Sequence, residues 1–141
     1  MKKTTATKQR VTVKELKLAK QLVKEYRGRL YFSNNLTPGA AAEVSLDTRC
    51  ISIAYGLLGY RDLFWSVIYH ELGHLYCHDN WKYPLYHRAN RNRLTAREKK
   101  GIILTGWRAE TYVDKWAARE LKQTYPDISY KGYLSLIHIS E

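Results

Sequence analysis

The spacing of apolar residues near the start of the chain predicts a helix. Residues 12–15 form a capping box, in which the side chains of Thr12 and Glu15 would satisfy each other's backbone N–H groups. The helix is expected to end at Gly28, because glycine commonly follows the last helical turn. Between these limits the apolar residues recur at helical spacing, at Leu16, Ala19, Leu22, Val23 and Tyr26.

Two stretches with β-type sequence follow this helix. They run from Arg29 to Ser33 and from Glu43 to Tyr55, and turn-forming residues such as Pro38 and Gly39 separate them. The alternation in the second stretch is interrupted at residues 47–49, which predicts a hairpin or two consecutive strands. We therefore expect a small mixed β-sheet, with an exposed edge near Ile51 to Tyr55.

A second helix is predicted from about Asp62, a suitable N-cap, to about Cys77. Residues 79–93 contain Pro84 and many Asn, basic and aromatic residues, a composition typical of a long surface loop. The apolar stripe of this helix consists of Leu63, Phe64, Val67, Ile68, Leu72 and Leu75.

A further capping box, at residues 95–98, opens a helical stretch that ends near Thr124, before Pro126. Gly101 and Gly106 are candidate kinks within it. The predicted fold class is thus α+β, with an N-terminal helix and a small sheet packed on two later helices.

Length and composition indicate one globular domain. The 141 residues are 45% hydrophobic and 13% aromatic, which is sufficient for a core without disulfides. Residues 1–11 lack periodicity and are expected to form a flexible basic arm, so the domain would span residues 12–133. Residues 134–141 resemble the translation of a sequencing adapter, so we expect a non-native tail and a native C-terminus missing beyond about Tyr133. His138 is excluded from the site on this ground.

Charge and hydropathy narrow the classes of partner. The net charge is +11, and the basic residues are concentrated in residues 1–30 and 82–100. Such a surface could contact nucleic acid or an acidic substrate, or it could simply be a basic face exposed to solvent. No apolar run approaches the ~20 residues of a membrane-spanning helix, so no membrane partner is expected. The start lacks the apolar core of a secretory signal and the chain has only Cys50 and Cys77, so we expect a cytoplasmic protein.

The second predicted helix carries the residues with the most distinctive chemistry. His70 and His74 are four apart and therefore share one face, so both imidazoles can reach one zinc ion. Glu71 is offset by one residue, where it can act as general base on a zinc-activated water. This HExxH arrangement predicts peptide-bond hydrolysis.

A catalytic zinc site needs a third protein ligand and one open position. The candidates are His78, His87 and Glu110. His78 is one turn beyond His74 on the same helix, about 6 Å further along its axis, so these three histidines would not converge on one ion. Spacing alone does not choose between His87 and Glu110.

The sequence around Glu110 carries a family resemblance. HExxH followed by a later helical ExxxD, formed here by Glu110 and Asp114, resembles the gluzincin zinc metallopeptidases, and in particular the ImmA/IrrE family found in mobile elements and stress-response loci. The resemblance implies a zincin-like fold, with His70, His74 and Glu110 as zinc ligands and Glu71 as catalytic base. Asp114 would then orient a ligand histidine, and the substrate would be a protein, such as a repressor or regulator.

Two other functions are considered. A SprT-like, DNA-associated zinc protease would use His87 as third ligand, and a basic nucleic-acid-binding domain would keep the metal residues without turnover. The presence of Glu71 argues against the second. A hydrogen-bond donor is also needed to stabilise the oxyanion of the transition state. The sequence does not choose among the candidates Tyr83, Tyr86, His87 and Tyr112.

Overall fold

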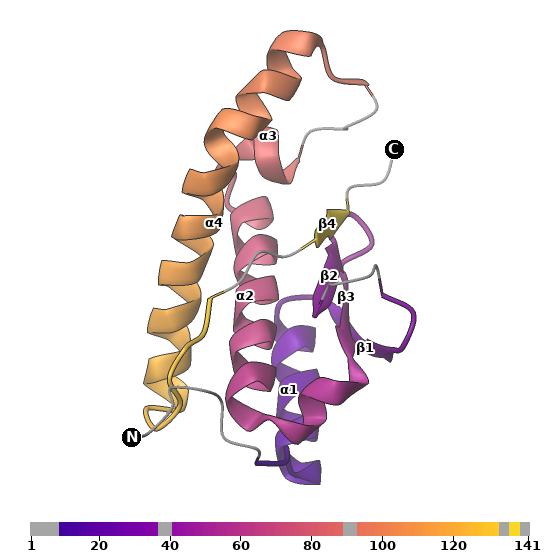
Figure 1. Cartoon of the computed structure of the whole chain (residues 1–141), viewed down its shortest axis with the longest axis vertical. Helices are drawn as coiled ribbons and strands as arrows, with labels where there is room; N and C mark the ends of the chain where they lie inside the picture. The colour runs from indigo at the N-terminus through magenta and orange to yellow at the C-terminus, as the bar shows by residue number, and fades with distance from the viewer. Residues whose placement is uncertain (1–8, 37–40, 89–92, 133–135, 139–141) are drawn as a thin grey trace, which may run out of the picture.

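The computed structural model describes residues 9–36, 41–88, 93–132 and 136–138. It shows an α+β fold, so the predicted class is confirmed (Figure 1). Within the described residues, no helix has the length and apolar character needed to cross a membrane. The elements in chain order are α1 (Val13–Glu25), β1 (Arg29–Ser33), β2 (Ala42–Ser45), β3 (Cys50–Ala54), the 3-10 helix η1 (Tyr55–Gly59), α2 (Arg61–Asp79), α3 (Pro84–His87), α4 (Ala96–Thr124) and β4 (Leu136–His138).

The helix boundaries follow the capping signals at two of the three long helices. Thr12 and Thr95 cap α1 and α4 in complete capping boxes, as predicted. The prediction for α2 was two residues late, because the helix begins at Arg61 and its N-cap is Tyr60, which makes no side-chain capping bond. Asp62 instead lies in the first turn, where a carboxylate still interacts favourably with the helix dipole.

The strand order in the sheet is β1-β3-β2-β4. β2 and β3 form the predicted hairpin, β1 pairs parallel to β3, and β4 pairs parallel to β2. The prediction of an exposed edge near Ile51 to Tyr55 was wrong, because β3 is a central strand with a partner on each side. The outer edge of β2 is lined by β4, which belongs to the segment that we expected to be a non-native tail.

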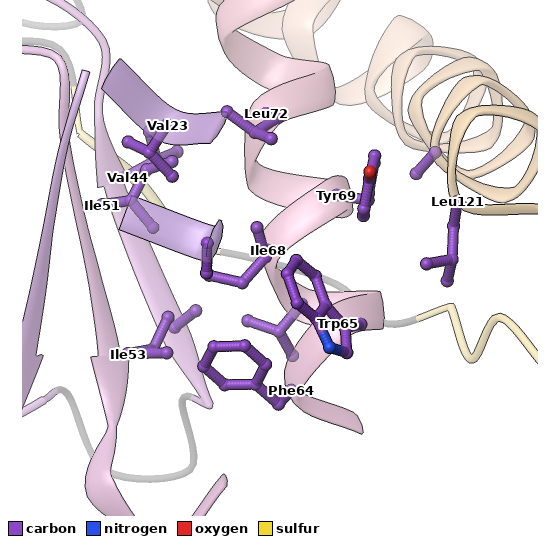
Figure 2. Close-up of a cluster of buried hydrophobic side chains, with 14 of the residues drawn as sticks. Val23, Val44, Ile51, Ile53, Phe64, Trp65, Ile68, Tyr69, Leu72 and Leu121 are labelled. Carbon is purple, nitrogen blue, oxygen red and sulfur yellow. The ribbon is translucent and has the colours of Figure 1, made fainter. Parts of the chain in front are cut away.

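Helix α2 is the central element of the fold, with the sheet on one side and α4 on the other (Figure 1). Every residue from Phe64 to Leu75 is buried, so α2 is covered around its circumference and not only along its apolar stripe. Figure 2 shows Phe64 and Ile68 directed toward Ile53 of the sheet, while Trp65 and Tyr69 lie toward α4. The HExxH motif therefore lies in the fully buried middle of α2.

Ion pairs hold both ends of α2 against the rest of the domain. At the start of the helix, the guanidinium of Arg61 contacts Glu15 of α1, and the indole N–H of Trp65 donates to the same carboxylate over 3.2 Å. At the end, Arg49 donates to both oxygens of Asp79 over 2.8 and 2.7 Å. Paired guanidinium–carboxylate bonds fix direction as well as distance, so α2 is anchored to α1 and to the β2–β3 turn.

Gly73 allows α4 to approach α2 closely. A Cβ atom at this position would lie 2.7 Å from Cγ1 of Val113 and 3.2 Å from Cε3 of Trp116, both on α4. Glycine costs about 1 kcal/mol relative to alanine inside a helix. Here that cost permits the contact between the helix that carries His70 and His74 and the helix that carries Glu110.

The segment after α2 is more structured than its composition suggested. It contains the short helix α3, which packs against α4, and its residue His87 is fully buried. Residues 89–92 of the predicted loop lie outside the described residues. Gly101 and Gly106 do not end α4, and a Cβ at these positions would lie 2.8 Å from Leu85 and 3.3 Å from Tyr86. The two glycines thus make room for α3.

Candidate metal centre

Three ligand atoms from α2 and α4 meet inside the domain. His70, His74 and Glu110 are all buried, and each offers one atom such that all three lie within 4.8 Å of one another. Nε2 of His70 is 3.1 Å from one carboxylate oxygen of Glu110, and Nε2 of His74 is 3.3 Å from the other. The two Nε2 atoms are 3.2 Å apart. The structure therefore brings together the three residues that the family resemblance implied.

The second ring nitrogen of His70 is held by two side chains. Its Nδ1 is 2.8 Å from Oδ1 of Asp114 and 2.9 Å from the hydroxyl oxygen of Tyr130, and this hydroxyl donates to the same Asp114 oxygen over 2.5 Å. Gly132 lies close by, since a Cβ there would be 3.1 Å from the Asp114 carboxylate. Such contacts orient a ligand histidine and direct its Nε2 away from them.

The second ring nitrogen of His74 contacts His87. Nε2 of His87 is 2.9 Å from Nδ1 of His74, on the side of the His74 ring that does not face Glu110. Burial and the neighbouring His74 lower the pKa of His87 to about 3, so His87 is neutral. This position does not favour His87 as third ligand. His78 lies outside the cluster, with its Nδ1 3.5 Å from Asp79, as helix geometry predicted.

Glu110 is held as a carboxylate by its partners. Burial alone would raise its pKa, but the hydrogen bond from His70 and the adjacent His74 hold the pKa well below its ordinary value. The hydroxyl of Tyr86 also donates to Glu110 Oε2 over 2.6 Å. Of the tyrosines considered as oxyanion donors, Tyr86 thus touches the ligand set, whereas Tyr83 and Tyr112 pack against each other, with ring centroids 5.8 Å apart.

Glu71 lies in the same buried region. Its side chain is fully buried, and its charge raises the pKa of both His70 and Tyr130. Its carboxylate therefore lies within electrostatic range of His70 and Tyr130, which themselves are 2.9 Å apart. A carboxylate at this position can take up a proton from a water or deliver one to a leaving group.

The donor set fits a divalent metal ion. Two imidazole nitrogens and one carboxylate oxygen are the ligands of many catalytic zinc sites. In both histidines Nδ1 has a partner outside the cluster, so Nε2 is the nitrogen directed toward Glu110. Other first-row divalent ions accept the same donors, so the three residues could hold a metal ion, and the geometry does not select which one.

The charge state of His70 predicts a pH effect on the metal-free protein. Burial alone would lower its pKa, but hydrogen bonds to Asp114 and Glu110 raise it from 6.5 to about 9. The folded state therefore binds this proton more tightly than the unfolded state does. The resulting stabilisation is complete below pH 6.5 and is lost as the pH rises through 9. A metal ion displaces the proton, so the metal-bound protein should not show this loss.

Urea unfolding at pH 6.5 and at pH 9, with a chelator or with zinc, would check this expectation. The free energy of unfolding should decrease with pH in the chelated sample and should decrease less, or not at all, with zinc. The same decrease in both samples would show that His70 does not hold the extra proton.

The sequence did not predict the contacts that Tyr86, His87 and Tyr130 make with the cluster. Tyr86 and His87 lie in the segment taken for a surface loop, and Tyr130 follows α4 in a stretch without periodicity. The only local signal is Pro84, which suits the first turn of a helix and does begin α3. Their roles depend on how three separate segments pack, which spacing along the chain does not encode.

No protein-family model, no curated protein and no solved structure matches this chain. The chemistry and geometry of the site are therefore the features from which a function can be inferred.

Proposed function

We propose that this protein is a zinc-dependent endopeptidase of the gluzincin type, with His70, His74 and Glu110 as zinc ligands. The observation that carries the proposal is the convergence of these three side chains beside Glu71. An HExxH pair alone would suit many metal sites. A buried carboxylate ligand from a second helix, together with a second glutamate next to the first histidine, is a combination that zinc-dependent peptidases use.

The residues take distinct roles in this proposal. A zinc ion bound here would supply a Lewis acid that polarises a peptide carbonyl and lowers the pKa of water. Glu71 accepts a proton from the attacking water and passes it to the departing amine. Tyr86 is our choice for the donor to the developing oxyanion, because it lies beside the ligand carboxylate; its single hydroxyl hydrogen would turn from Glu110 to the oxyanion during the reaction. Asp114 keeps His70 in the orientation that presents Nε2 to the ion.

The proposed substrate is a segment of another protein. The resemblance to the ImmA/IrrE family favours a repressor or another regulatory protein. The net charge of +11 favours an acidic partner over a basic one.

Metal removal tests the proposal. The purified protein is expected to bind one zinc ion per chain, measured by elemental analysis after dialysis, and to cleave an unfolded model protein such as casein. Dialysis against a chelator should abolish the cleavage, and one equivalent of zinc should restore it, because the ion would supply the Lewis acid for the reaction. Cleavage that persists without metal, or a protein that takes up no zinc, would contradict the proposal.

A further inference from the structure

His87 stands at the end of α3 and belongs to none of the roles assigned above. It is fully buried, and its two ring nitrogens have different partners. Nε2 is 2.9 Å from Nδ1 of His74, and Nδ1 is 3.0 Å from the backbone carbonyl oxygen of Lys82. The three groups thus form a line from a backbone carbonyl to a metal-binding histidine.

The direction of the hydrogen bonds in this line follows from the chemistry of its first member. A carbonyl oxygen only accepts, so Nδ1 of His87 must carry the hydrogen in the bond to Lys82. A neutral imidazole has a single N–H, so Nε2 of His87 has a lone pair and accepts from Nδ1–H of His74. Nε2 of His74, the atom that faces Glu110, is then left without a hydrogen and can bind a metal ion.

The segment around His87 is fixed by contacts on several sides. The amide of Lys82 donates to the carbonyl of Cys77 over 2.9 Å, which ties the segment to α2. The guanidinium of Arg88 donates to the carbonyl of His78 and lies 3.8 Å above the ring of Trp81. On the other side, α3 meets α4 at the two glycines described above, and Figure 1 shows α3 against the upper half of α4. His87 is therefore held firmly enough to orient another ring.

We propose that His87 is a positioning residue, which accepts a hydrogen bond from Nδ1 of His74 and so keeps His74 in the tautomer that offers Nε2 to a metal ion. The proposal rests on the metal site of the proposed function. Under this proposal α3, which lies between α2 and α4 in the chain, orients a metal ligand through His87. Asp114 performs the corresponding task for His70, so each metal-binding histidine has its own partner on a different element.

The tautomer can be observed directly in the metal-free protein. Long-range ¹H–¹⁵N spectra of the wild type, with His74 assigned through a His74→Gln variant, should show His74 with its hydrogen on Nδ1. His87 should also carry its hydrogen on Nδ1. A His74 ring with its hydrogen on Nε2 would overturn the proposal, whether or not the protein binds zinc or cleaves peptides.

Two substitutions at His87 test the consequence for metal binding. His87→Leu removes the acceptor, and zinc affinity, measured by competition with a chromophoric chelator, should fall about 10–100-fold. His87→Gln offers an amide oxygen in place of Nε2 and should stay within a few-fold of the wild type. His78→Gln changes a histidine outside the cluster and serves as the matched control. Circular dichroism and thermal melting establish that each variant is folded.

The possible results separate the two proposals. Wild-type affinity in a folded His87→Leu variant would overturn the role of His87 and leave the metal site intact. Zinc binding lost equally in His87→Gln and His87→Leu would overturn it too, since a ligand, unlike a hydrogen-bond acceptor, is not replaced by an amide. Absence of zinc binding in the wild type would instead contradict the proposed function, while the tautomer measurement would still decide the role of His87.

Discussion

A Glu71→Gln variant is expected to bind zinc like the wild type and to lose peptide hydrolysis by roughly 10²–10⁴-fold, the usual contribution of a general base. Glutamine has nearly the shape of glutamate, so the packing of the buried side chain should change little. It has no carboxylate to accept a proton, so water attack and protonation of the departing amine both lose their catalyst. The three proposed zinc ligands, His70, His74 and Glu110, are unchanged in this variant.

The rate of cleavage of a fluorogenic peptide and the zinc content would be measured on the same preparation. A Glu98→Gln variant provides the control, because Glu98 is an exposed capping residue at the start of α4. If Glu71→Gln keeps its zinc and cleaves at the wild-type rate, Glu71 is not the base. If neither the wild type nor Glu71→Gln cleaves the peptide, but both have the same effect in the cell, the chain is a metal-binding domain without turnover.

Replacement of Glu110 by glutamine is expected to weaken zinc binding by at least about 100-fold, more than the 10–100-fold typical for loss of an outer hydrogen-bond partner. The carboxylate is the only negatively charged member of the three-residue cluster. Its pKa is held low by its contacts with the two histidines, so it is ionised at neutral pH. An amide keeps the size and can still accept from Tyr86, but it does not neutralise the charge of the ion.

Isothermal titration with zinc would measure this effect. Glu120→Gln is the matched control, because Glu120 lies on the same helix but interacts with Tyr26 and Tyr69, away from the cluster. Undiminished zinc affinity in Glu110→Gln would refute the gluzincin site. If His87→Gln alone abolished binding, the SprT-like alternative with His87 as ligand would be preferred.

The parts of the site that could be predicted are those encoded locally. His70 and His74 share a helical face because they are four residues apart, and Glu110 and Asp114 do so for the same reason. The two β-type stretches and both capping boxes also depend on near neighbours, and the structure has them at the expected places.

The parts that could not be predicted depend on packing between distant segments. Whether Glu110 or His87 faces His70 and His74 is decided by how α4 and α3 dock on α2, and this choice was left open by spacing. The exposed edge was misplaced because alternation identifies strands but not their order in the sheet. Tyr130 reaches Asp114 only because the chain turns back across α2 after α4.

In the proposed metal site, the close approach of α2 and α4 at Gly73 sets the distance between the ligands that the two helices carry. Two ligands stand on one helix and the third on the other, so the distance between the helix axes sets how near Glu110 can come to the histidines. Gly73 itself would not touch the ion, yet it sets this distance. Any side chain at this position would push α4 away from α2, so metal affinity could be changed there without replacing any ligand.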